Sequence, residues 1–221
     1  MARATVESSI FESNVDVGMV TLGGELTVDS SYIAKTFPAG SDGSHGGGIS
    51  VQGTTSSRAS ATLSNTTLTS LHSFGVMAAM ADITMSACTL REVDKDETSG
   101  SYGDAILAVN DADLSIDGCS IDGAARVAIS AFGARASIHD VWFGCNGINL
   151  DDETLVDGMF GYSGEPLASK LINSGGNLCR CGDRVVACAV TSSSLTPPAA
   201  VHTLPPPASA NGSNVSVNAQ N

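Results

Sequence analysis

Aromatic residues and positive charges are scarce in this chain. Only 5% of its 221 residues are aromatic, and ten Lys and Arg stand against 23 Asp and Glu, which gives a formal net charge of −13. So few large side chains argue against an ordinary globular core, whereas 24 glycines suit short stacked strands joined by tight corners. The acidic balance argues against nucleic acid or an anionic membrane surface as a partner. Cations and neutral glycans remain compatible partners.

Long apolar runs are also lacking. No stretch approaches the length needed to cross a membrane, and the start has no positive segment followed by an apolar core. The sequence therefore predicts no membrane-spanning segment and shows no signal peptide. Residues 1–3 lead straight into the first repeat, although an open end of stacked strands usually needs a cap. We expect a chain that is incomplete at its N-terminus or has a misassigned start; the alternative is a loop or side chain that covers the end.

An eight-residue pattern recurs along most of the chain, with LSIDGCSI at residues 114–121 as its clearest copy. Three of the five spacings between copies are 22 residues, and the others, 35 and 31, are 22 plus insertions of 13 and 9. The third and eighth positions are apolar and the second is hydroxylic, which is the alternation of a strand with one face inward. Small or turn-forming residues at the fifth position predict a bend, so each period is typical of one coil of a solenoid. The copies begin at Ala4, Leu26, Ala61, Ile83, Leu114 and Ala136.

Both insertions leave the solenoid at the same corner. A usual coil takes 8 residues from the eighth-position side chain to the next strand, but 16 in the coil after Ile33 and 17 between Leu90 and Leu107. The loops at 34–48 and 91–103 therefore start two coils apart, roughly 10 Å along one edge if strands stack about 4.8 Å apart. Loops on one side of a repeat array commonly carry binding sites, so we expect these two to be presented together.

The pattern continues into a seventh coil, which begins at residues 148–150 and loses its regularity near Phe160. Each coil provides at least two strands, because a second apolar strand precedes each new copy. We therefore assign residues 1–160 to one all-β domain, a parallel β-helix of about seven coils.

The remainder of the chain differs in composition. Residues 161–190 are expected to form a C-terminal cap or irregular segment, with a short helix at 164–171 that tolerates Pro166 in its first turn and a last strand within 179–190. Residues 191–221 are rich in Ser, Pro, Ala and Asn, and we expect a disordered tail there.

The repeat resembles the right-handed parallel β-helix families, in which each coil adds short parallel strands to an apolar stack, over about residues 4–160. FESN at 11–14 and FGCN at 143–146 are similar to the Phe-x-x-Asn motif of the polymorphic outer membrane protein repeats, and both Phe residues occupy the eighth position. GGGI at 46–49 is similar to the Gly-Gly-Ala-Ile motif of those repeats, although Ile or Leu replaces Phe in the other four coils. That family implies surface display and adhesion, and hence an extracellular or cell-surface location. It supplies no catalytic residues.

Outward residues of adjacent coils become neighbours without being close in sequence. At the fourth position, Asp117 and His139 are expected to stack with Asp140 beside them. Glu7 and Asp29 would form a like-charge pair that a cation such as calcium relieves. The β-helix polysaccharide lyases and hydrolases use carboxylates and calcium on an outer face, which makes this column a candidate for ligand binding. The alternative is that these are solvated corner residues.

The densest acidic cluster, at 149–153, contains Asp151 and Asp152. Acid and base roles in glycoside hydrolysis need two carboxylates roughly 5 to 9 Å apart, whereas consecutive strand residues point to opposite faces. His45 in the first long loop and Trp142 in an outward column are candidates to contact a sugar, or else isolated surface residues. We assign no catalytic, cofactor-binding or metal residue, and calcium is the one cofactor left open.

The six cysteines form an even number that suits an oxidising compartment. Cys88 and Cys119 occupy the same column in adjacent coils, at a separation that a disulfide can span; stacked free thiols are equally compatible. The Cys-x-Cys spacing at 179–181 lacks a second ligand pair and does not favour zinc. The glycine triplet at 46–48 is interpreted as a corner rather than a phosphate loop, because no helix follows it.

These observations favour a non-enzymatic extracellular surface or adhesion module that binds a cell-surface glycan or protein through the loops at 34–48 and 91–103. No nucleic acid partner is expected. The alternative is a fragment of a β-helix polysaccharide lyase or glycoside hydrolase that uses the fourth-position cluster or the acidic cluster. A structural spacer is a third possibility.

Overall fold

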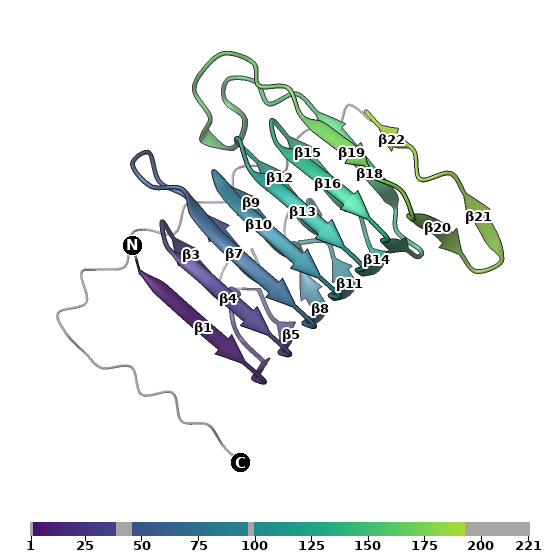
Figure 1. Ribbon diagram of the computed structural model, residues 1–221, viewed down its shortest axis with the longest axis horizontal. Coiled ribbons are helices and arrows are strands. Elements are labelled where there is room, and N and C mark those ends of the chain that lie inside the picture. Colours follow the sequence, from purple (N-terminus) through teal and green to yellow (C-terminus); the bar gives the residue numbers. More distant parts are fainter. Residues whose placement is uncertain (1, 39–45, 97–99, 193–221) are drawn as a thin grey trace.

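A computed structural model describes residues 2–38, 46–96 and 100–192. It is an all-β, right-handed parallel β-helix in which each coil contributes one strand to each of three sheets (Figure 1). The strands of the first sheet lie side by side from β1 to β19 across the front of this view. The predicted fold class is confirmed, with three strands per coil where the repeat required at least two.

The first sheet contains β1 (Arg3–Glu7), β4 (Glu25–Asp29), β7 (Ala59–Ser64), β10 (Ala81–Ser86), β13 (Asp113–Asp117), β16 (Arg135–His139) and β19 (Lys170–Asn173). The second contains β2 (Ile10–Glu12), β5 (Tyr32–Thr36), β8 (Thr67–His72), β11 (Thr89–Asp94), β14 (Ser120–Ala124), β17 (Trp142–Phe143), β20 (Leu178–Cys181) and β21 (Arg184–Val186). The third contains β3 (Val17–Leu22), β6 (Gly47–Gln52), β9 (Phe74–Ala79), β12 (Asp104–Val109), β15 (Val127–Phe132), β18 (Ile148–Glu153) and β22 (Val190–Thr191). Strands β20 and β21 form an antiparallel hairpin at the C-terminal end.

The register of the first sheet follows the sequence repeat. Every first-position residue from Ala4 to Ala136 pairs with its equivalent in the next coil, and the row continues to Leu171 on β19. The eighth-position row likewise continues to Cys179 on β20. The solenoid therefore extends beyond Phe160, where the sequence pattern fades. Residues 154–169 separate β18 from β19 and hide the regular spacing.

The core is a stack of inward apolar side chains, and each coil adds one layer. Burying one such side chain stabilises the fold by roughly 1.5–3 kcal/mol. The third-position residues from the second to the sixth coil are at most 1% exposed: Val28, Leu63, Met85, Ile116 and Ile138. The fifth-position residues turn the chain with φ between 47° and 58°, which explains their small or turn-forming character: Ser8, Ser30, Asn65, Ala87, Gly118 and Asp140.

The middle strands of the third sheet, β6, β9, β12 and β15, are buried on both faces. Its outer face carries a second apolar cluster that includes Phe74, Leu107 and Phe132. Residues 154–169 fold back over this face, and Phe160 packs edge to face on Phe132 with ring centroids 5.4 Å apart. Both faces of these strands are therefore buried, and the alternation of buried and exposed residues seen in the first sheet is absent.

The helix expected at 164–171 is wrong. Leu167 forms an antiparallel bridge with Leu155, and β19 already begins at Lys170. The only helical turn in the described chain is a 3-10 turn at Met159–Gly161. The bridge pairs the backbone groups of both leucines while Leu155 is buried in the outer cluster and Leu167 packs against it, which a helix over this segment would not allow.

Both insertions leave at the corner between the second and third sheets, as predicted. Of the 13 extra residues in the first, 8 precede Ile49 and 5 follow it before β7. In the second, Ile106 rather than Leu107 aligns with Val76 and Ile129, so the expected register of β12 is wrong by one residue. An extra residue in the turn between β12 and β13 caused this error.

The glycine triplet is only partly a corner. Gly46 turns the chain with φ of +100°, but Gly47 and Gly48 lie within β6. A Cβ on Gly47 would come within 2.2 Å of the Phe74 ring, and one on Gly48 within 2.5 Å of the Gly75 carbonyl oxygen. Close packing between coils, rather than turning, therefore requires these two glycines.

Two disulfides fasten the C-terminal end, Cys145–Cys181 and Cys179–Cys188. Cys88 and Cys119 are stacked, buried free thiols, which decides between the two alternatives for this column. Hydrogen bonding with Cys119 lowers the pKa of the Cys88 thiol to about 7.

The expected tail begins within β22, and residues 193–221 lie outside the described residues. In the part of the chain that the structure describes, no helix is long and apolar enough to cross a membrane.

Candidate functional site

The outer face of the second sheet carries a row of exposed or half-buried side chains, one from each coil. Because inward and outward positions alternate, the residue before each eighth-position core residue points outward. The row is apolar at its two ends and hydroxylic in the middle. In register along the sheet it contains Ile10, Tyr32, Thr67, Thr89, Ser120, Trp142 and Leu178.

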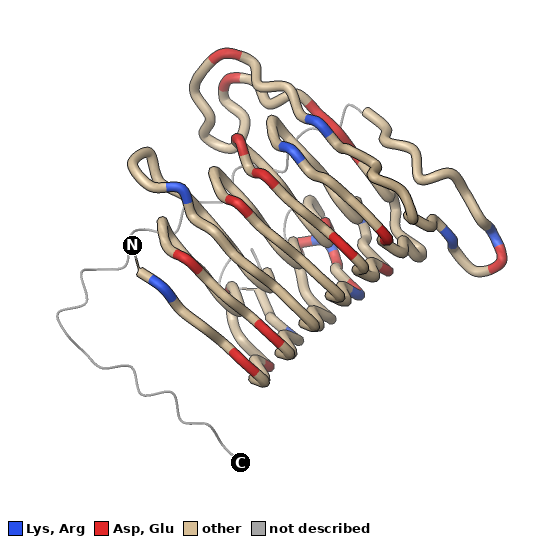
Figure 2. The backbone as a smooth tube through the Cα atoms, viewed as in Figure 1, with Lys and Arg blue, Asp and Glu red and all other residues tan. Residues whose placement is uncertain are grey.

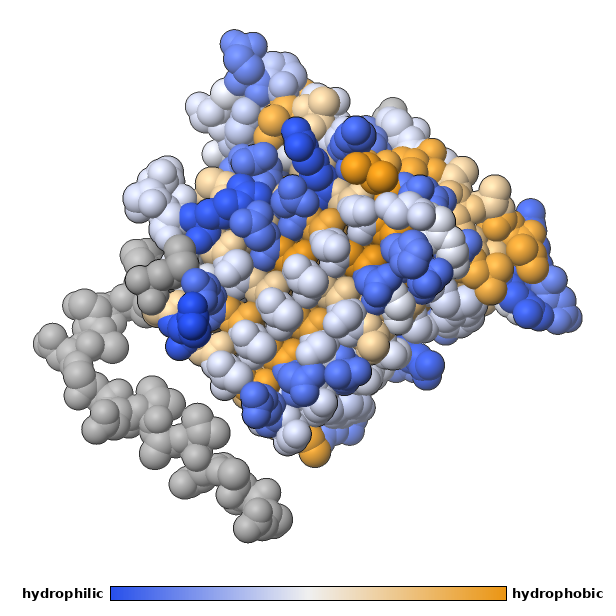
Figure 3. Space-filling model, viewed as in Figure 1, coloured by the Kyte–Doolittle hydropathy of each residue, from blue (hydrophilic) through white to orange (hydrophobic). Residues whose placement is uncertain are grey.

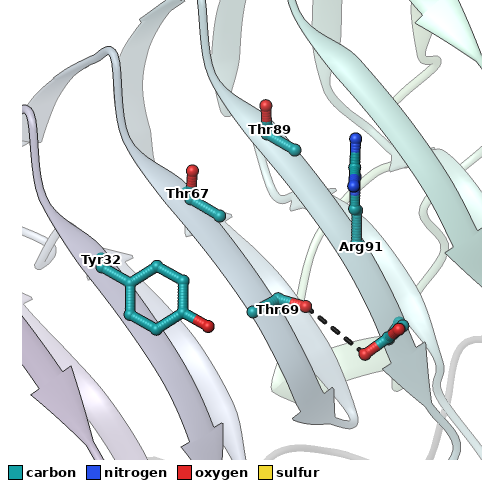
Figure 4. A pocket seen from close by; sticks show the side chains of 6 residues that line it. Tyr32, Thr67, Thr69, Thr89 and Arg91 are labelled. Carbon is teal, nitrogen blue, oxygen red and sulfur yellow. Dashed lines mark hydrogen bonds between the residues drawn. The ribbon is translucent and has the colours of Figure 1, made fainter.

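A groove of about 400 Å³ lies over β5, β8 and β11. It forms because short side chains in the middle of the row lie between larger ones. Figure 4 shows Tyr32 reaching over the neighbouring strand, with Thr67, Thr89 and Arg91 standing on the same side of the sheet. Its lining residues are Tyr32, Thr67, Thr69, Thr89, Arg91 and Glu92.

Glu92 forms one wall of the groove. Its backbone has φ of +54° and lies in a column of left-handed residues that includes Lys35 and Ser70. The Ser70 hydroxyl donates to Glu92 Oε2 at 2.8 Å. The Thr69 hydroxyl donates to the same oxygen at 3.5 Å, the dashed line in Figure 4. These contacts hold the carboxylate against β8.

Arg91 stands in the groove without a partner in the described chain. Asp122 is its neighbour in register on β14, but Asp122 Oδ1 accepts the Cys145 backbone N–H at 2.6 Å. A Cβ added to Gly144 would lie only 2.1 Å from Asp122 Oδ1, which explains why position 144 is a glycine. Both nearby carboxylates are thus held elsewhere, and the guanidinium faces solvent.

The predicted neighbours Asp117, His139 and Asp140 do come together. His139 Nδ1 lies 2.7 Å from Asp117 Oδ1 and 3.5 Å from Asp140 Oδ2, and all three residues are exposed. The hydrogen bond to Asp117 and the charge of Asp140 raise the pKa of His139. A ring Nδ1–H that donates to the Asp117 carboxylate cannot also ligate a cation through Nδ1, so the geometry is that of an exposed hydrogen-bonded pair at a corner.

In Figure 2, the acidic residues of the first sheet lie towards the two ends of its strands. The middle of the face is uncharged, and in Figure 3 pale rows run between blue margins. Glu7 and Asp29 are in register, as predicted. Hydrogen bonds from Ser64, Ser30 and Asn65 lower the pKa of Asp29, so its charge is satisfied by the protein itself.

Asp151 and Asp152 lie on opposite faces of β18, as predicted. Asp151 is fully buried on the outer face of the third sheet, near Asp104. Asp104 is also fully buried and forms an ion pair with Arg126, whose Nε lies 2.8 Å from Asp104 Oδ1. Burial raises the pKa of Asp104, and Arg126 opposes this. Acids shielded from solvent in this way cannot reach a polysaccharide chain.

His45 lies outside the described residues. Trp142 is half-buried in the outward row, as predicted, three coils from Thr67. Sequence reasoning missed the other groove residues, and it also missed the Asp104–Arg126 pair. Comparing equivalent positions of adjacent coils would have revealed both. Arg91 and Asp122 share a row of the second sheet, and Asp104 and Arg126, at or just before the start of strands of the third sheet, are 22 residues apart, one coil.

No protein-family model matches this chain, and no curated protein matches it significantly.

Proposed function

We propose that this protein is a non-enzymatic extracellular surface or adhesion module that binds a glycan in the groove over β5, β8 and β11. The observation that carries the proposal is the outward row in which a hydroxyl floor lies between Tyr32 and Trp142. Ligand sites commonly combine aromatic surface with a few placed polar groups. Sugars offer apolar C–H faces for the ring and hydroxyls for the threonines.

The spacing of the solenoid supports binding across the strands. Adjacent coils lie about 4.8 Å apart, so Tyr32 and Arg91 are separated by about 10 Å. An extended oligosaccharide laid along the solenoid axis would meet a hydroxyl on each coil. The two disulfides support an oxidising, extracellular location, and they agree with the surface role implied by the resemblance to polymorphic outer membrane protein repeats.

Binding without turnover is favoured by the charges of the groove. Glu92 is its single carboxylate, whereas acid and base roles in glycoside hydrolysis need two, about 5 to 9 Å apart. Of the other described candidates, Asp117, His139 and Asp140 are exposed at a corner and Asp151 is fully buried. Asp152 is half-buried, and its Oδ2 accepts the Leu171 backbone N–H at 3.2 Å.

A glycan array with the intact protein tests the proposal. We expect binding to a subset of oligosaccharides and a loss of about tenfold or more in Tyr32→Ala, since stacking and burial of an aromatic contribute over 1 kcal/mol. Thr84→Ala, on the exposed face of the first sheet, is the matched control and should bind as the natural protein does. Absence of any glycan binding, or release of shortened or unsaturated products, would contradict the proposal.

A further inference from the structure

Arg91 brings a positive charge into the groove of an acidic molecule. The chain carries a net charge of −13, and several other arginines and lysines are paired: Arg3 with Glu25, Lys35 with Glu12, Arg58 with Asp82 and Arg126 with Asp104. Arg91 has carboxylates on both sides and pairs with neither. A guanidinium without an internal ion pair, placed in a groove, is suited to bind an anionic group of a ligand.

The two neighbouring carboxylates are kept away from Arg91 by specific contacts. Asp122 is occupied by the Cys145 N–H at 2.6 Å, next to the Cys145–Cys181 disulfide that fastens this strand end. Glu92 is turned by its left-handed backbone toward Ser70, whose hydroxyl lies 2.8 Å away. The guanidinium therefore does not have to break an internal ion pair before it binds a ligand.

The neighbours of Arg91 define what kind of anion fits. Thr89 precedes it on the same face of β11, Thr69 lies beside it on β8, and the Tyr32 ring lies across the groove (Figure 4). Hydroxyls and an aromatic face next to a guanidinium suit a ring that carries both hydroxyls and a carboxylate. A guanidinium binds a carboxylate with two parallel hydrogen bonds, which gives direction as well as strength.

Given the glycan-binding role proposed above, on which this inference rests, we infer that the groove selects oligosaccharides that bear a carboxylate. The carboxylate binds Arg91, hydroxyls of the same sugar meet Thr69 and Thr89, and a neighbouring sugar stacks on Tyr32. Glu92 disfavours ligands whose negative charges are spread along the whole chain, because a second anionic group would meet it. Sparse carboxylates are therefore preferred over dense sulfates.

Calorimetry with the full chain tests the selectivity. The probes are a neutral trisaccharide, the same trisaccharide with one uronic acid residue, the same trisaccharide ending in sialic acid, and a sulfated analogue. We expect one of the carboxylated probes to bind about tenfold or more tighter than the neutral one, since hydrogen bonds to charged groups exceed neutral ones by this order. Which carboxylated probe binds better identifies the source of the carboxylate.

Arg91→Gln should abolish the preference, measured within the variant as the ratio of its affinities for the carboxylated and neutral probes, and Arg91→Lys should retain the preference only in part. Arg135→Gln removes an exposed arginine from the first sheet and is the matched control, which should keep the preference. Equal affinity for neutral and carboxylated probes, tighter binding of the sulfated probe, or the same loss in Arg135→Gln would overturn the selectivity while leaving glycan binding intact. Failure of every probe to bind would overturn both the selectivity and the proposed function.

Discussion

At the scale of single residues, the coils bring together side chains that are 22 residues apart. His139 and Asp117 make such a contact on the exposed face, with Nδ1 and Oδ1 2.7 Å apart. The contact favours the protonated imidazole, so the pKa of His139 is raised above its usual value of 6.5. Stability from this contact is present below pH 6.5 and is lost as the pH rises through the raised pKa.

We expect the Asp117→Asn substitution to lower the pKa of His139, because the asparagine keeps the size of the side chain and removes its charge. The measurement is an NMR titration of the His139 ring protons. Asp113→Asn, at the other end of the same strand and beside Arg135 in register, should leave the titration unchanged. An unshifted pKa for His139 in the natural protein would refute the ion pair.

At the scale of elements, the third sheet depends on small inward residues at the start of each strand. Gly48, Gly75 and Ala105 follow one another in adjacent coils, and a Cβ on Gly75 would lie 2.5 Å from the Ala105 carbonyl oxygen. The Ala105 carbonyl group belongs to the backbone and cannot move aside as the end of a flexible side chain could. The corner between the second and third sheets is therefore drawn in close to the core.

Gly75→Ala should destabilise the protein by about 1–3 kcal/mol, the usual range for an overpacked core. Chemical denaturation followed by circular dichroism measures the change in the free energy of unfolding. Ser115→Ala, on the exposed face of β13, is the control and should change stability by no more than about 0.5 kcal/mol. An unchanged free energy of unfolding in Gly75→Ala would show that the backbone packing is looser than described.

At the scale of the whole molecule, the repeat allowed the fold and the register of the first two sheets to be predicted. Inward residues such as Ile116 and Leu68 have no alternative place in a solenoid, so their spacing reports the coil directly. The third sheet was less predictable because its middle strands are buried on both faces and so lack alternation. Leu107 was aligned with Val76 and Ile129 because one extra residue precedes β13, and the lack of alternation concealed the shift; its side chain belongs to the second, outer cluster.

The candidate site was predicted only in part. The sequence made the exposed acidic residues obvious candidates, and the contact of Asp117 with His139 was predicted correctly. These two side chains hydrogen bond to each other, however, and so do not require a ligand. The groove depends instead on the short side chains of Thr67 and Thr89, which leave space between Tyr32 and Arg91. Such a hollow emerges only when outward rows are read across coils.

The central claim is that the outer face of the second sheet binds a glycan. Chemical-shift mapping by NMR tests it most directly, with isotope-labelled protein titrated with the best-binding oligosaccharide from the array. We expect the largest shifts on β5, β8 and β11, at Tyr32, Thr67, Thr89 and Arg91. Shifts confined to the corner of Asp117, His139 and Asp140, or no saturable shifts at all, would contradict the claim.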